Sequence, residues 1–283
     1  MITFLHEIFT YPFLGNAALA ALLSGIACGI IGTYIVARRL VFMSGGITHA
    51  SFGGIGIAYY LGANPLWGAL IFAVCSAVGI EAFSRNGKVS EDAATGVLWS
   101  LGMTVGIIFI FLTPGYAPNL MSFLFGNILM VDSHNLLWLA GLDLFLIVLF
   151  SLCYRAIVYT AFDREFAASQ KLPTGWISHL MMILIAATIV LSIKTMGIVL
   201  LMSLLTLPVL IAGTLTRNYK SQTLWACILG ALGTFLGLYV SYESNIPSGA
   251  SAIAVLAITY GVVRIVAACF RRLRQKQAAT SRG

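Results

Sequence analysis

Charged residues are scarce in this chain of 283 residues: 9% of positions are Asp, Glu, Lys or Arg, and 60% are hydrophobic. Soluble domains carry roughly 25% charged residues, so the composition excludes an ordinary soluble domain, a disordered chain and a DNA-binding protein. Two stretches, 40–80 and 93–131, contain no charged residue. Each is about twice the roughly 20 residues that one transmembrane helix needs. The chain is therefore predicted to lie mostly in a membrane, with no nucleic-acid partner.

Motifs for nucleotide binding and hydrolysis are also missing. The sequence contains no GxxxxGK[ST] phosphate loop, no HExxH and no GxSxG. These motifs cradle phosphates, hold a catalytic zinc or present a nucleophilic serine. We therefore expect no catalytic residue and no permanently bound cofactor, and any ATP must be bound by another chain. The five cysteines stand singly without a CxxC pair, which is typical of small buried residues.

Nine hydrophobic stretches predict a polytopic, all-α membrane bundle. The sixth stretch has only 14 residues and is interpreted as half of a broken helix, so eight spans remain an alternative. No basic residue precedes Arg38, and the first stretch is too long for the core of an export signal, so we interpret it as a retained span. The predicted spans are 14–36, 43–61, 66–83, 93–112, 136–154, 180–193, 197–215, 223–241 and 250–268.

Basic residues predict the orientation. If the first span runs inward, 14 of the 16 Lys and Arg residues fall in cytoplasmic segments, and Lys194 alone lies outside. This bias predicts an external N-terminus and a cytoplasmic C-terminus in a bacterial inner membrane. We expect a single transmembrane domain over 1–283, with a long cytoplasmic connection at 155–179 and a basic cytoplasmic tail at 269–283. The connection is expected to contain a helix beside the membrane.

The second span carries a stripe of small residues and an ionisable group. Gly46, Ala50 and Gly54 recur every four residues, which allows another helix backbone to come close. His49 lies between them, and an ionisable residue inside a span predicts function by default. Neutral imidazole is a good ligand for zinc, manganese or iron. The alternative is a neutral histidine that forms a hydrogen bond with a nearby carbonyl.

Four further features in or beside the spans lead to predictions. Asp143 lies in the fifth span, where a carboxylate either faces water or a cation or reaches the headgroups. Pro208 removes a backbone hydrogen bond and is expected to kink the seventh span, forming a hinge or serving packing alone. Glu81 is expected to be solvated at the inner end of the third span. Ser90 with the two acids after it is expected to cap the fourth.

Four segments in order resemble motifs of the membrane permeases of zinc, manganese and iron ABC importers. Residues 42–50 are close to FMGDALSHA, 122–129 to SYLFGDIL, 162–167 to FDPELA, and 199–217 to GVLLVSALLIIPAATARLL. The similarity is collinear from about residue 38 to 258. Each motif is weak alone, but the four in order on a nine-span background are fairly specific.

The resemblance implies a permease that dimerises, with an identical or a different second copy, around a central path. It implies ATP-binding cassette ATPase subunits on the cytoplasmic side and an extracytoplasmic metal-binding protein outside, with the metal ion as transported cargo. His49 falls on the family's histidine and implies a place on the metal path. The coupling helix that seats in the ATPase falls at Phe162, Asp163, Glu165, Phe166 and Ala167.

The chain departs from the family's pattern at four positions. Gly45 and Asn127 replace acidic residues, and lost carboxylates weaken a site for a hard cation. Arg164 and Lys171 replace a proline and a glycine in the coupling segment.

Alternatives to a metal importer also follow from the sequence. The same architecture carries a metal chelate or a cobalamin-like solute if the path is wide and apolar. A secondary transporter driven by protons or sodium would use His49 and Asp143 as relay groups. An intramembrane enzyme built on these two residues is disfavoured, because no second catalytic carboxylate or ligand pair lies at helical spacing beside either. The sequence therefore predicts an ATP-driven metal permease, with Asp143 as a second candidate metal ligand.

Overall fold

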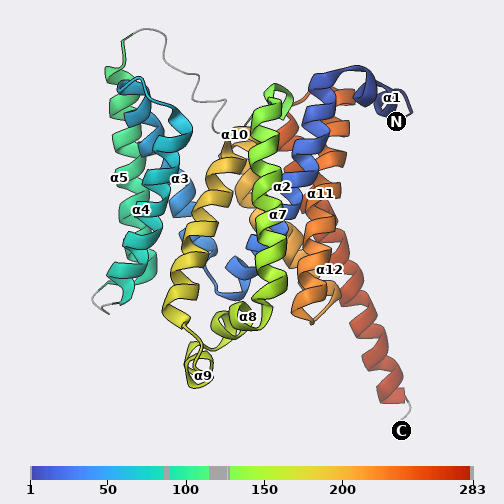
Figure 1. Cartoon of the computed structure of the whole chain (residues 1–283). Coiled ribbons are helices and arrows are strands. Elements are labelled where there is room, and N and C mark those ends of the chain that lie inside the picture. Colours follow the sequence, from blue (N-terminus) through green and yellow to red (C-terminus); the bar gives the residue numbers. More distant parts are fainter. Residues whose placement is uncertain (1, 86–88, 115–125, 127, 281–283) are drawn as a thin grey trace.

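The computed structural model describes residues 2–85, 89–114, 126 and 128–280, and all regular structure in these ranges is helical. The predicted all-α bundle is thereby confirmed (Figure 1). In chain order the elements are α1 (Ile2–Thr10), α2 (Pro12–Ala37), α3 (Val41–Tyr60), α4 (Pro65–Arg85), α5 (Glu91–Leu112), the short turn η1 (Ile128–Met130), α7 (Ser133–Leu152), α8 (Tyr154–Phe162), α9 (Arg164–Ser169), α10 (Thr174–Leu215), α11 (Tyr219–Ser244) and α12 (Ser248–Thr280).

Seven helices are long and apolar enough to cross a membrane, namely α2, α4, α5, α7, α10, α11 and α12. Helix α10 has 42 residues, and a straight helix of that length would measure about 63 Å, twice the hydrocarbon core of roughly 30 Å. It therefore does not run straight. Gly197 has φ 73° and ψ 166°, which interrupts the helix, and such a positive φ favours glycine.

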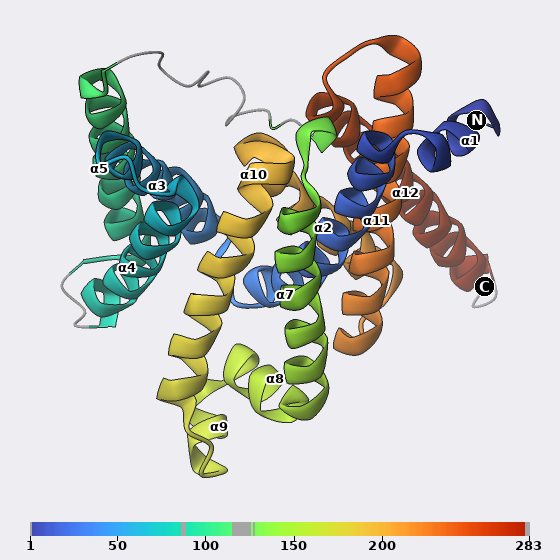
Figure 2. The ribbon, with the colours of Figure 1, turned by 45° about the horizontal axis from the view of Figure 1, so that its top comes forward.

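The chain reverses at Gly197. Lys194 donates from Nζ to Oδ1 of Asn135 (3.2 Å), so the top of the first limb lies beside the start of α7. The second limb, 198–215, returns toward α8 and α9 (Figures 1 and 2). We call the two ends of the bundle the α1 end and the α9 end after the short helices found there. The expected break between the sixth and seventh spans is thus a full reversal, and the sixth span begins earlier than expected, at Thr174.

Helix α3 is the remaining helix of membrane-crossing length. Its 20 residues run from the α9 end to the α1 end, and most of them are buried. Its glycine, serine, threonine and histidine residues keep it out of the set of seven candidate spans. With α3 and two limbs of α10, nine helical segments of the described chain run between the two ends.

The helices form two groups. Helices α3, α4 and α5 pack on one another and make the α3 group, whereas α2, α7, α10, α11 and α12 make the α2 group. Helix α10 also packs on α3 and α4 and so joins the groups (Figure 2).

Close packing in the α2 group depends on glycines that the sequence analysis did not single out. A Cβ on Gly29 would lie 2.5 Å from the backbone nitrogen of Cys227, and one on Gly25 would lie 2.5 Å from Cα of Ala231. From Gly25 to Gly29 the residue number rises along α2, whereas the contacted residues of α11 fall from Ala231 to Cys227. The two helices are therefore antiparallel. The signal was present, because Gly25 and Gly29 have the same four-residue spacing as the stripe in α3.

The connection 155–179 contains two short helices, α8 and α9, and not one. Asp163 separates them: its backbone is extended (φ −147°, ψ 99°), and its Oδ1 accepts a hydrogen bond from the N–H of Phe166 at 2.9 Å. This aspartate therefore acts as the N-cap of α9. The basic segment after residue 268 continues α12 as helix to Thr280.

Candidate functional site

The small-residue stripe of α3 faces two helices. A Cβ on Gly102 of α5 would lie 2.5 Å from Cα of Ala50, and Gly46 lies against Thr95 of the same helix. Gly54 lies against Gly68 of α4. These contacts leave no room for larger side chains, so they fix α3 between its neighbours and determine where its other faces point.

His49 lies on a face of α3 that remains half-buried. Its ring stacks on Trp99 of α5, with centroids 4.3 Å apart and planes at 7°. Its Nδ1 is buried and has no hydrogen-bond partner. The interpretation that Nδ1 bonds a nearby carbonyl therefore fails. The imidazole is thus held flat against the indole, with an enclosed and unpaired Nδ1 on a side chain that is half-buried.

The face of α3 one turn before His49 meets a thioether. A Cβ on Gly45 would lie 2.8 Å from Cε and 3.6 Å from Sδ of Met202, which comes from the second limb of α10. Gly45 thus leaves space that a methionine from another helix fills. Because His49 follows Gly45 by four residues, the two positions lie on one side of α3.

Asp143 lies in a different place, inside the α2 group. Its side chain is 3% exposed, and neither carboxylate oxygen has a hydrogen-bond partner. It is within electrostatic range of the thiols of Cys28 and Cys227, on α2 and α11. A buried carboxylate does not reach the headgroups, so that alternative is wrong for Asp143.

The two candidate metal ligands are not brought together. The first limb of α10 stands between α3, which carries His49, and α7, which carries Asp143 (Figures 1 and 2). Within the described ranges, no three His, Cys, Asp or Glu side chains converge to hold a metal ion. Any metal site on His49 must therefore use other donors, a second chain or water.

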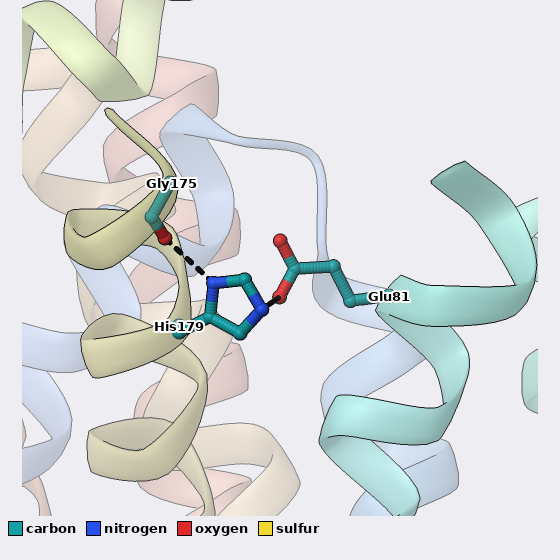
Figure 3. A network of polar contacts seen from close by, with 3 residues as sticks. All are labelled: Glu81, Gly175 and His179. Carbon is teal, nitrogen blue, oxygen red and sulfur yellow. Dashed lines mark hydrogen bonds and ion pairs between the residues drawn. The ribbon is translucent and has the colours of Figure 1, made fainter. Parts of the chain in front are cut away.

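An ion pair joins the two helix groups near the α9 end. Figure 3 shows Glu81 of α4 pointing toward His179 of α10, with Oε2 and Nε2 3.9 Å apart. Nδ1 of His179 lies 2.7 Å from the carbonyl oxygen of Gly175, which holds the ring in place. The Glu81 side chain is only 13% exposed, so the expectation that it is solvated was wrong. Its partner lies 98 positions away, which no local pattern reveals.

The end of α2 contacts the connection that contains α8 and α9. Nη1 of Arg38 donates to the carbonyl oxygen of Thr160 in α8 (3.3 Å). In α9, Ala167 is fully buried and Phe166 is 47% exposed, and Phe162 at the end of α8 is 66% exposed. Glu165 is exposed as well. The α9 end thus exposes two aromatic rings and acidic groups on a segment tied to α2.

The predicted kink at Pro208 and the predicted cap at Ser90 can also be compared with the structure. The backbone stays helical at Pro208, which is buried in the second limb of α10, and the non-helical residue of α10 is Gly197. Ser90 caps α5, because its Oγ accepts from the N–H of Ala93 at 3.2 Å, with Glu91 and Asp92 in the first turn, as predicted. Asn127 and most of the motif at 122–129 lie outside the described residues.

Comparison with known proteins places these features in context. Residues 10–267 match the ABC 3 transport family. The chain is 38% identical to an uncharacterised membrane protein of Synechocystis, over 96% of this chain and 95% of that protein. It is 33% identical to the manganese transport system membrane protein MntC of Halalkalibacterium halodurans, over 92% and 89%. The solved structure of PsaBC from Streptococcus pneumoniae in complex with Fab superposes with a TM-score of 0.87 at 27% identity, covering 98% of this chain and all of that one.

Proposed function

The chain belongs to the ABC 3 transport family, and from this we propose that it is the membrane permease of an ATP-driven importer of a divalent transition metal ion. The permease itself performs no catalysis. It alternates between states open to either side, and ATP acts by binding partner subunits that favour one state, since a ligand shifts an equilibrium only through differential affinity.

The observation that carries the proposal is the stacked, unpaired imidazole of His49. Imidazole binds transition metals through a neutral nitrogen, and a single weak ligand suits transport because a tightly held ion does not leave. The site lies on a half-buried face and not in a closed cage. This supports a path completed by a second copy of the permease, identical or not, with the ion between the two chains.

Two observations bear on the identity of the ion, namely the name of a relative and the donor atoms beside His49. The name of the Halalkalibacterium relative favours manganese. The donors beside His49 favour a softer ion, because Gly45 offers no carboxylate and the Met202 thioether lies one turn away. Zinc and iron therefore remain in the proposal beside manganese, and competition among the three ions for uptake decides between them.

Asp143 is proposed as a second, separate contact for the ion. A partnerless buried carboxylate within a membrane bundle marks an ion pathway by default. Its position among α2, α7 and α11, near two thiols, supports a role apart from His49. Pro208 and Gly197 both lie in α10, which joins the helix groups, and are proposed as the positions about which that helix flexes.

The ATPase subunits are proposed to bind at α9. Phe162 and Phe166 supply exposed rings, Ala167 anchors the helix, and Asp163 and Glu165 supply negative charge. The basic residues gathered in the segments at the α9 end support a cytoplasmic position for it. The N-terminus and the surface for a metal-binding protein then lie outside a bacterial inner membrane.

Replacement of His49 by Ala tests the proposal. We expect uptake of radiolabelled manganese, zinc and iron to fall about tenfold, equivalent to about 1.4 kcal/mol, while the ATPase still co-purifies. Ser100→Ala is the control, because Ser100 is exposed on α5 and its hydroxyl bonds only its own helix. Normal uptake by the His49 variant contradicts the assignment.

Charge reversal tests the docking of the ATPase separately. Glu165→Lys should weaken co-purification of the ATPase with the permease, whereas Glu243→Lys at the opposite end of the bundle should not. Equal recovery of ATPase from both variants removes α9 from the interface.

A further inference from the structure

A cavity of about 750 Å³ opens between α2, α7 and α11. Its walls are Ile26 and Ile30 of α2, Ile147 and Phe150 of α7, and Leu224 and Ile228 of α11. Its size lies in the range of roughly 300–1,000 Å³ that ligand cavities occupy. It lies away from His49 and from α9, and Asp143, although it is near Cys227, does not line it, so no role proposed above accounts for the cavity.

Two hydroxyl groups on the walls are already paired, whereas that of Tyr219 is buried without a hydrogen-bond partner. Oγ of Ser151 donates to the carbonyl of Ile147 (2.6 Å), and Oγ1 of Thr223 donates to that of Tyr219 (3.0 Å). The walls therefore offer a ligand apolar surface and little hydrogen bonding. A water-soluble molecule would lose its hydration there without compensation.

The cavity has the depth of one membrane leaflet. It extends along α11 from Lys220 to Ala231, and the eleven steps between these residues correspond to about 16 Å of helix. This is close to half of the hydrocarbon core of roughly 30 Å. Its apolar part lies toward the middle of the bundle, and Tyr154, Tyr219 and Lys220 form its mouth at the α9 end.

The mouth is positively charged. Nζ of Lys220 lies 4.6 Å from the centroid of the Tyr154 ring, which holds the ammonium group at the edge of the cavity. Burial raises the pKa of the Tyr154 phenol, so this neighbour stays neutral and does not cancel the charge. Arg155 and Arg217 are adjacent in sequence to the mouth and exposed, and no acidic residue lines the cavity among the described residues.

We propose that this cavity binds one anionic phospholipid from the leaflet at the α9 end, with an acyl chain between α7 and α11 and the phosphate at Lys220. Basic pockets between transmembrane helices bind anionic headgroups in this way. The bound chain fills the space that α7 and α11 leave open over α2, and so holds α7, which leads into α8 and α9, against the bundle.

Native mass spectrometry of the permease purified with its ATPase tests the site, with phosphatidylglycerol and phosphatidylcholine of identical acyl chains as probes. We expect the wild type to retain phosphatidylglycerol several-fold better than phosphatidylcholine. Lys220→Gln should abolish this preference, and Leu224→Trp, which narrows the cavity, should reduce retention of both lipids. Arg272→Gln and Leu144→Trp are the controls, because both positions are exposed outside the cavity.

Three outcomes overturn the proposal. The first is equal retention of both lipids by the wild type, and the second is a Lys220→Gln variant with unchanged preference. The third is a Leu224→Trp variant that retains lipid normally but changes the number of permease copies, which identifies the cavity as a surface between chains. Displacement of phosphatidylglycerol by glycerol 3-phosphate alone would assign the site to a free phosphate and likewise contradict it.

Discussion

Helices α2 and α3 each form the centre of a helix group, and both pack through glycines. The two groups differ in whether their buried polar side chains have hydrogen-bond partners. In α3, the hydroxyls of Ser44, Thr48 and Ser51 each donate to a carbonyl of their own helix. In the α2 group, Ser24 and Asp143 are buried with side-chain oxygens that lack partners. The unpaired group of α3, Nδ1 of His49, lies instead on a half-buried face.

Polar side chains are thus accommodated in the membrane bundle in two ways, either by hydrogen bonds within their own helix or without a partner between helices. Hydroxyls that bond their own helix cost little and need no partner on another helix. Groups left unpaired between helices are costly, and they persist where they bind something. In α3 the unpaired atom belongs to a half-buried side chain, whereas in the α2 group the unpaired oxygens belong to fully buried side chains.

The largest loss of stability should come from a substitution at the contact between α3 and α5. Gly102→Ala places a Cβ 2.5 Å from Cα of Ala50 and should destabilise the fold by about 1–3 kcal/mol. Gly96→Ala on the same helix meets nothing within 4 Å, so it should be neutral or slightly stabilising because alanine favours helix. Thermal unfolding of the two purified variants measures both. Equal midpoints would mean that the helices do not meet at Gly102.

A smaller effect on stability should follow from Asp143→Asn in the α2 group. No hydrogen bond is lost, because both carboxylate oxygens are unpaired, so stability should change by less than about 1 kcal/mol. Metal uptake should nevertheless fall several-fold, because an amide cannot ionise to bind the cation. Asp132→Asn is the control, since Asp132 caps α7 and asparagine caps equally well. Uptake equal to that of the control would remove Asp143 from the path.

The smallest effect should come from the ion pair between the groups. Glu81→Gln removes the charge facing His179, whose side chain is 43% exposed, so solvent screens the pair and its contribution should be about 0.2–1 kcal/mol. A double-mutant cycle with His179→Gln, followed by thermal unfolding, isolates the interaction. A coupling energy of zero would show that the α9 end is held together by packing alone.

The elements were predictable to the extent that their signals are local. Long uncharged runs gave the number and order of the segments, and Ser90 before two acids gave the start of α5. The reversal at Gly197 was only hinted at by a short sixth span, since a glycine inside an apolar run does not reveal its φ. Helix α1 was not predicted, because the first span was placed at 14–36 and no element was assigned to the residues before it.

The candidate site was predictable only in part. His49 stood out as an ionisable residue in a span, but its stacking on Trp99 joins residues 50 positions apart. The Met202 contact joins residues even farther apart in sequence, and methionine in an apolar span usually signals nothing beyond packing. Tertiary contacts of this kind depend on which helices become neighbours, which residue periodicity alone does not specify.

The most direct test is metal accumulation in proteoliposomes that contain the permease with or without its ATPase. We predict that labelled metal accumulates only when the ATPase, ATP and the metal-binding protein are all present. Accumulation driven by a proton or sodium gradient across vesicles that contain the permease alone would contradict the account.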